Sequence, residues 1–190
     1  MPNRLLTTQE HHRICEGGIT MGTDVNAADR HGRTVLMTAA QEGRPEAVEA
    51  LIAQGANVNA RDEYGWTALM RASLRGRLDI VKILIAHGAW IHVKSDGGWT
   101  ALMRASLAGH REVVELLIAN GADVNARQDN GATALIWASQ EGHRAVVELL
   151  IANGADVNAK TNNGVTATMI AFNRSEDEIV QILKNAGATE

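Results

Sequence analysis

The sequence predicts an all-α repeat solenoid, built from stacked helix-turn-helix units that are joined by β-hairpin-like turns. Two series of residues, both with a period of 33, indicate this fold. Glycines recur at this period from Gly22 to Gly187. The second series is a threonine that follows another glycine by two positions, at Thr34, Thr67, Thr100, Thr133 and Thr166. Such a period is typical of stacked helical units, because each unit buries its apolar face only against a neighbour.

Residues 95–127 illustrate how one unit is built. Gly98 permits a turn with a positive φ, and Thr100 is a good N-cap for a first helix that Gly109 ends. A second helix follows, in which the apolar residues between 113 and 118 recur at helical spacing. An extended segment then leads to the next turn, so the expected order is helix, turn, helix and hairpin-like connection.

The period divides the chain into a degenerate N-terminal cap and five repeats. Gly17 and Gly18 stand where a second helix of the cap should have apolar side chains. In the last repeat, Phe172 replaces a small residue and fits only if no further repeat stacks on it. Ser175 and Glu178 have the spacing of a capping box, so the last repeat is expected to act as a C-terminal cap. The expected boundaries are 1–28 for the N-terminal cap and 29–61, 62–94, 95–127, 128–160 and 161–190 for the repeats.

The composition argues against several classes of partner and location. The net charge is −4 and no basic stripe dominates, so neither nucleic acid nor an anionic membrane is expected to bind. The single cysteine, Cys15, fits a reducing compartment better than a disulfide-rich secreted protein. No apolar run approaches the roughly 18 to 20 residues of a membrane span, and no signal peptide is evident. We therefore expect a cytoplasmic monomer.

The repeated motif resembles the ankyrin repeat over about residues 29–190. Each unit has a counterpart of the family's T-P-L-H-x-A signature, although Val or Ala replaces its proline and Met or Ile replaces its histidine. Because these departures are uniform, they affect the hydrogen bonding of the turn rather than the fold. The matching segments are TVLMTA at 34–39, TALMRA at 67–72 and at 100–105, TALIWA at 133–138 and TATMIA at 166–171.

The resemblance implies a non-enzymatic scaffold that binds a partner protein on a concave surface. In the family, turn tips and the exposed side of the first helices form that surface. Three of the four Trp residues and the only Tyr fall on these positions in repeats two to four, and Trp, Tyr and Arg dominate binding hot spots. The alternative is that the Trp rings cover local apolar surface between adjacent turns. The predicted partner-binding residues are Tyr64, Trp66, Arg71, Arg75, Trp99, Arg104 and Trp137.

Two other functions stay open. Repeats two and three are nearly identical over GWTALMRASL, which also suits a structural or engineered scaffold with no dedicated partner. In the family, asparagines of the V-N-A segments can be substrates of hydroxylation, and an intact-mass measurement would detect the added oxygen. The residues that match this position are Asn26, Asn59, Asn125 and Asn158.

No pattern in the chain indicates a catalytic, metal or cofactor site. His110 and His143 occupy a position that the resemblance makes structural, and the pair His11–His12 lacks a fixed ligand geometry. Trp90 stands where other units carry Asp or Asn. It is either an exposed secondary contact or a local packing variant.

Overall fold

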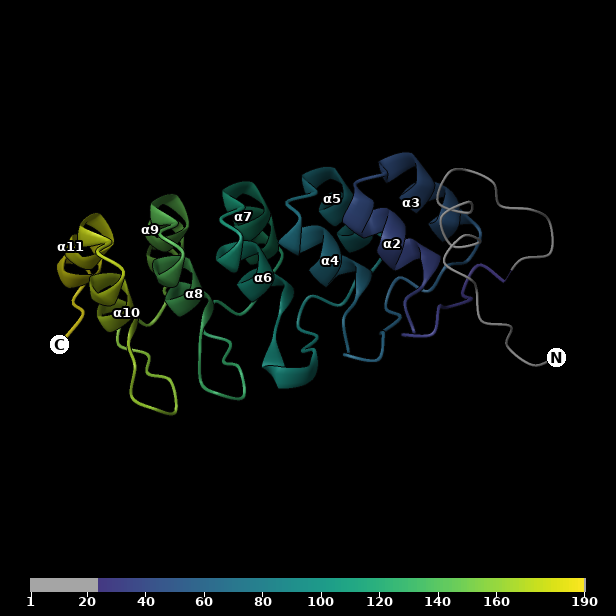
Figure 1. The fold of residues 1–190 in the computed structure, drawn as a ribbon. Coiled ribbons are helices and arrows are strands. Elements are labelled where there is room, and N and C mark those ends of the chain that lie inside the picture. Colours follow the sequence, from purple (N-terminus) through teal and green to yellow (C-terminus); the bar gives the residue numbers. More distant parts are fainter. Residues whose placement is uncertain (1–23, 190) are drawn as a thin grey trace. The chain divides into compact units, whose positions relative to one another are not determined.

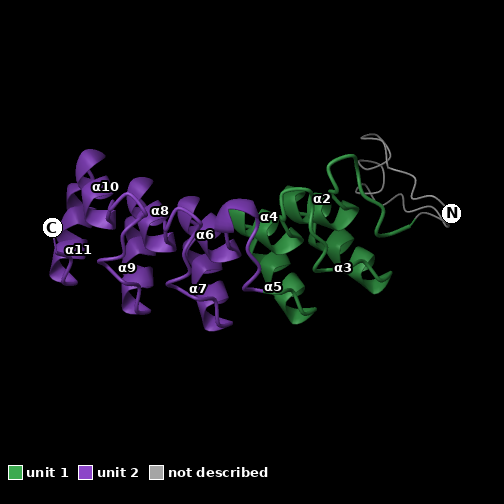
Figure 2. Cartoon of the chain, turned by 90° about the horizontal axis from the view of Figure 1, so that it is seen from below, with its two compact units in different colours: residues 1–90 green, residues 91–190 purple. Residues whose placement is uncertain are grey.

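The computed structural model describes residues 24–189. Over this range the chain forms ten α-helices and one short 3₁₀ helix, and its only β pairing consists of two isolated bridges (Figure 1). The chain divides into two compact units, residues 1–90 and 91–190 (Figure 2). The predicted N-terminal cap, residues 1–28, lies almost wholly outside the described residues.

The described part of unit 1, residues 24–90, contains two helical pairs. The first pair is α2 (Val35–Glu42) and α3 (Pro45–Ala53), and the second is α4 (Ala68–Leu74) and α5 (Leu78–Ala86). Within unit 1, α2 packs on α4 and α3 packs on α5, while each pair also packs on itself. The first helices therefore form one layer of this unit and the second helices form the other.

Unit 2 contains three helical pairs arranged in the same way. The first helices α6, α8 and α10 pack in sequence order, and so do the second helices α7, α9 and α11. The loops that connect one pair to the next extend from the same side of this unit (Figure 1). Its elements are η1 (Asp96–Gly98), α6 (Ala101–Leu107), α7 (Arg111–Ala119), α8 (Ala134–Gln140), α9 (Arg144–Ala152), α10 (Ala167–Asn173) and α11 (Asp177–Asn185).

The periodic threonines start the first helices, as the sequence predicts. The hydroxyl of Thr100 accepts a hydrogen bond from the amide of Met103 at 3.2 Å, and the other four threonines cap their helices in the same way. An alanine five residues after each threonine is completely buried, which lets neighbouring helices approach closely. The predicted all-α repeat solenoid is therefore confirmed. The buried alanines are Ala39, Ala72, Ala105, Ala138 and Ala171.

The predicted capping box of the last helix is wrong. The N-cap residue of α11 is Glu176, and it makes no side-chain cap hydrogen bond. Ser175 instead has a φ of 60° and stands one period after Gly142, whose φ is 73°. The tight connection between the two helices of a repeat requires a left-handed residue here, which glycine adopts at no steric cost. This constraint on the backbone of Ser175 overrides the local sequence signal.

Candidate functional site

In unit 1, Arg71 on α4 lies between an aromatic ring and a carboxylate. Its guanidinium carbon is 5.4 Å from the ring centroid of Trp66, and its Nη2 pairs with Oδ2 of Asp62. Nη1 also donates to Oε1 of Gln41 on α2 at 2.8 Å. Burial lowers the pKa of Arg71, and the hydrogen bond and charge of Asp62 oppose that shift. Arg71 is therefore engaged by partners inside unit 1.

Asp62 organises the turn tip as well as the arginine. Its Oδ1 accepts hydrogen bonds from the amides of Tyr64 and Trp66, both at 2.9 Å, and its side chain is only 2% exposed. The sequence reasoning missed this residue. No signal in the sequence indicated it, because the same Asp stands nine positions before Thr38 in repeat one and the same Arg follows Ser95 by nine positions in repeat three.

Tyr64 and Arg75 do not join the Trp66–Arg71 contact. Tyr64 is 57% exposed, and a hydrogen bond with Glu63 raises the pKa of its phenol. Arg75 is the exposed C-cap residue of α4. Across residues 24–90, no side-chain hydrogen bond links either of them to Trp66 or Arg71. Of the four predicted residues in unit 1, the structure therefore brings two together.

In unit 2, all three predicted residues form one stack. The guanidinium carbon of Arg104 on α6 lies 3.8 Å from the ring centroid of Trp99. The rings of Trp99 and Trp137 stack with centroids 4.8 Å apart and an interplanar angle of 26°. Nε1 of Trp137 donates to Oε1 of the buried Gln128 at 3.1 Å. We call Arg104, Trp99 and Trp137 the aromatic stack.

The aromatic stack is both half-buried and pre-organised. Burial lowers the pKa of Arg104 to about 10, so the side chain keeps its charge at neutral pH. Cation–π and aromatic contacts contribute about 0.5–1.5 kcal/mol each, which favours the observed rotamers of the three side chains. Gln128, which lies in the turn before α8, orients the indole of Trp137 through this hydrogen bond. Like Asp62, it was not predicted from the sequence. The stack presents a rigid surface that combines apolar rings with a cation.

Asparagines tie successive connecting loops together. Nδ2 of Asn59 donates to the carbonyl of Gly88 at 3.0 Å, and its Oδ1 accepts from the amide of Trp90 at 2.8 Å. Asn26, Asn125 and Asn158 make the same pair of hydrogen bonds with residues 29 and 31 positions later. We call this series the asparagine ladder, and each such pair of bonds a rung.

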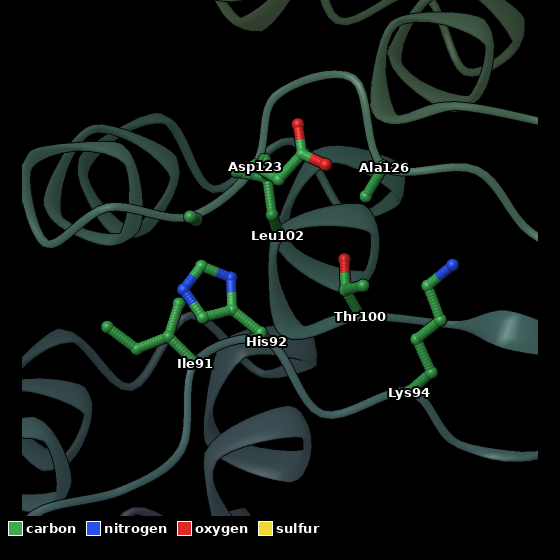
Figure 3. Close-up of a pocket in the computed structure, with 8 residues that line it drawn as sticks. Ile91, His92, Lys94, Thr100, Leu102, Asp123 and Ala126 are labelled. Atoms are coloured by element: carbon green, nitrogen blue, oxygen red, sulfur yellow. The ribbon is translucent and has the colours of Figure 1, made fainter.

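His92 interrupts the asparagine ladder in unit 2. It stands one period after Asn59, but in residues 91–189 its side chain bonds neither the carbonyl of Gly121 nor the amide of Asp123. A cavity of about 140 Å³ lies at this place, with His92, Lys94 and Asp123 among its lining residues (Figure 3). The rung that the other repeats close with a carboxamide is therefore open here.

Trp90 lies outside both groups of predicted residues. Its side chain is 63% exposed, and its amide is held by Asn59.

Metal-ligand and membrane-spanning features are not seen in the described part of the chain. Within residues 24–189, no group of three or more His, Cys, Asp or Glu side chains could hold a metal ion. None of the helices formed by these residues has the length and apolar character needed to cross a bilayer. His11, His12 and Cys15 lie outside the described residues.

Comparison with known families supports the resemblance seen in the sequence. A family model described as ankyrin repeats in three copies matches residues 7–95, 62–128, 87–161 and 125–189. These overlapping matches together span residues 7–189. A search of curated proteins found no match to the chain.

Proposed function

Because the chain belongs to the ankyrin repeat family, whose repeats generally mediate protein–protein interactions, we propose that it is a non-enzymatic scaffold that binds a partner protein. The proposed contacts are the turn tips and first helices of repeats two to four. They comprise Tyr64, Trp66, Arg71 and Arg75 in unit 1 and Trp99, Arg104 and Trp137 in unit 2.

The observation that carries this proposal is the aromatic stack. Large aromatic side chains with fixed rotamers lose little conformational entropy on binding, which makes them effective anchors. Trp99, Arg104 and Trp137 have fixed contacts with one another and still keep part of their surface exposed. Arg71 is expected to contribute less, since Asp62 and Gln41 already occupy its donors.

Partner capture with matched variants tests the proposal. The variants are Trp66→Ala with Trp99→Ala, and Trp99→Ala with Trp137→Ala. The control is Trp90→Ala, which removes an exposed ring of the same kind outside the proposed contacts. We expect both double variants to capture the partner from cell extract about ten-fold less well or worse, while the control behaves as the wild type.

Urea unfolding of the same proteins separates binding from stability. A loss of capture without a matching loss of stability supports the proposal. If capture falls only in proportion to stability, the Trp rings serve packing alone and the proposed contacts are wrong. If the wild type captures no reproducible partner, the alternative of a scaffold without a dedicated partner is favoured.

A further inference from the structure

The last repeat exposes a face that the earlier repeats bury. On α10, Met169 is 44% exposed and Phe172 is 71% exposed, whereas the equivalent residues of the other repeats are at most 2% exposed. An apolar hollow of about 260 Å³ lies beside them, and Thr168, Val180 and Lys184 also line it. Contiguous exposed apolar surface of this kind marks an interaction site more often than isolated apolar residues do.

Three substitutions make this face unsuitable for another repeat of the same pattern. Phe172 replaces the small Ala or Ser that lets neighbouring repeats approach, and Lys184 replaces an Ile. Thr168 replaces a fully buried Leu, which hollows the face. The Thr168 hydroxyl is itself buried, without a hydrogen-bond partner among residues 24–189. In both shape and polarity, these residues therefore differ from the equivalent residues of the earlier repeats, which pack against a following repeat.

The charges on α11 are complementary to those of an antiparallel copy of the same helix. Asp177 lies in its first turn and Lys184 in its last, and the seven-residue spacing places both on the side of Val180. Arg144, one period before Asp177, reaches Glu178 of the following repeat with a bond of 2.9 Å. By the same geometry, Asp177 projects from the exposed face.

We propose that this end face, formed by Thr168, Met169, Phe172, Asp177, Val180 and Lys184, is the interface of a homodimer. A two-fold axis near Val180 sets the two α11 helices antiparallel, which brings Asp177 of each copy opposite Lys184 of the other. The exposed Phe172 of each copy then packs against the apolar wall of its mate. Such an interface is isologous, because one self-complementary patch serves both copies. The sequence predicts a monomer, so the two expectations are directly opposed.

Sedimentation equilibrium of the full chain, from about 1 µM to about 500 µM, tests the dimer. We expect a concentration-dependent dimer whose Kd rises about ten-fold or more in Phe172→Ser, which installs the residue found one period earlier at Ser139. Asp177→Lys should also raise the Kd, because it places a lysine of each copy opposite Lys184 of the other. Adding Lys184→Asp to that variant should restore dimerisation. Trp90→Ala, which removes an exposed ring elsewhere, should have no effect.

Three results would overturn the proposal. The first is a monomer at every concentration. The second is a dimer that Phe172→Ser leaves unchanged, which would place the interface on another face. The third is a charge-swapped double variant that associates no better than Asp177→Lys. Circular dichroism checks folding, and the charge swap decides independently if Phe172→Ser fails to fold.

Discussion

Repeats two and three share the segment GWTALMRASL, yet their arginines lie in different surroundings. In unit 1, Arg71 pairs with the buried carboxylate of Asp62. In unit 2, Arg104 lies on the ring of Trp99, and the position equivalent to Asp62 is occupied by Ser95. The arginines of two identical first helices therefore have different partners, and the difference comes from the residue nine positions earlier.

The same relation holds in repeat four with different residues. Gln128 occupies the position of Asp62, and it accepts a hydrogen bond from the indole of Trp137 instead of pairing with an arginine. In repeats two and four, the residue at the start of the turn therefore bonds the side chain nine positions later on the first helix.

The largest expected effect comes from Asp62→Ala. It leaves the buried Arg71 without its carboxylate and removes the acceptor for two turn amides, so we expect a loss of about 3–5 kcal/mol in the free energy of unfolding. Urea denaturation measures it. The matched change Ser95→Ala removes only a hydroxyl that donates to Asp96 O at 3.3 Å, and it should cost less than about 0.5 kcal/mol. If both variants lose a similar free energy of unfolding, the residue at this position does not account for the difference between the two repeats.

Ser95→Asp should make unit 2 resemble unit 1. A carboxylate at this position can pair with Arg104 and accept the turn amides, as Asp62 does, for an expected gain of about 1–2 kcal/mol. Pairing lowers the pKa of a carboxyl, so the gain is present above about pH 4 and is lost as the pH falls further. Urea denaturation at pH 7 and pH 3 checks both statements. A gain that persists at pH 3 would exclude the ion pair as its cause.

His92→Asn extends the comparison to the asparagine ladder. The new carboxamide can close the interrupted rung with the carbonyl of Gly121 and the amide of Asp123, and we expect a gain of about 1 kcal/mol. Hydrogen exchange of the Asp123 amide should slow in parallel with the gain. The reverse change, Asn125→His, should cost a similar amount. If neither substitution alters stability, the hydrogen bonds of a rung are no more favourable than those that the same groups make with water.

The smallest expected effect comes from Ser175→Gly. Glycine relieves the positive φ at this position but adds freedom to the unfolded chain, so the net gain should be about 0.5 kcal/mol. Thermal unfolding followed by circular dichroism measures it. Ser175→Ala keeps the strained backbone and should show no gain. Equal effects of Gly and Ala would mean that φ is not the cause.

The fold could be predicted from the sequence because the periodic residues act locally. Thr100 caps its own helix and Gly98 takes the positive φ of its own turn, so both signals can be read from residues close by in the sequence. Ser175 was misinterpreted for the same reason, since the local S-x-x-E pattern ignores the backbone that its repeat position imposes.

The candidate site was only partly predictable. Aromatic and Arg residues on variable positions were visible, but their stacking depends on neighbours in other repeats, as with Trp99 and Trp137. The roles of Asp62 and Gln128 depend on a contact across nine residues, which only the folded turn creates. Their binding role remains a prediction that the Trp variants address.

The interrupted rung at His92 also has a mechanical consequence. In a stack where each repeat holds mainly its neighbour, a chain pulled from its ends opens at the contacts that resist least. Rungs closed by asparagine carry two side-chain bonds each, whereas the His92 rung carries neither within residues 91–189. When the chain is pulled, we therefore expect the loop that contains His92 to detach from the rest of unit 2 first. We expect this one histidine to make its loop an early point of opening under force.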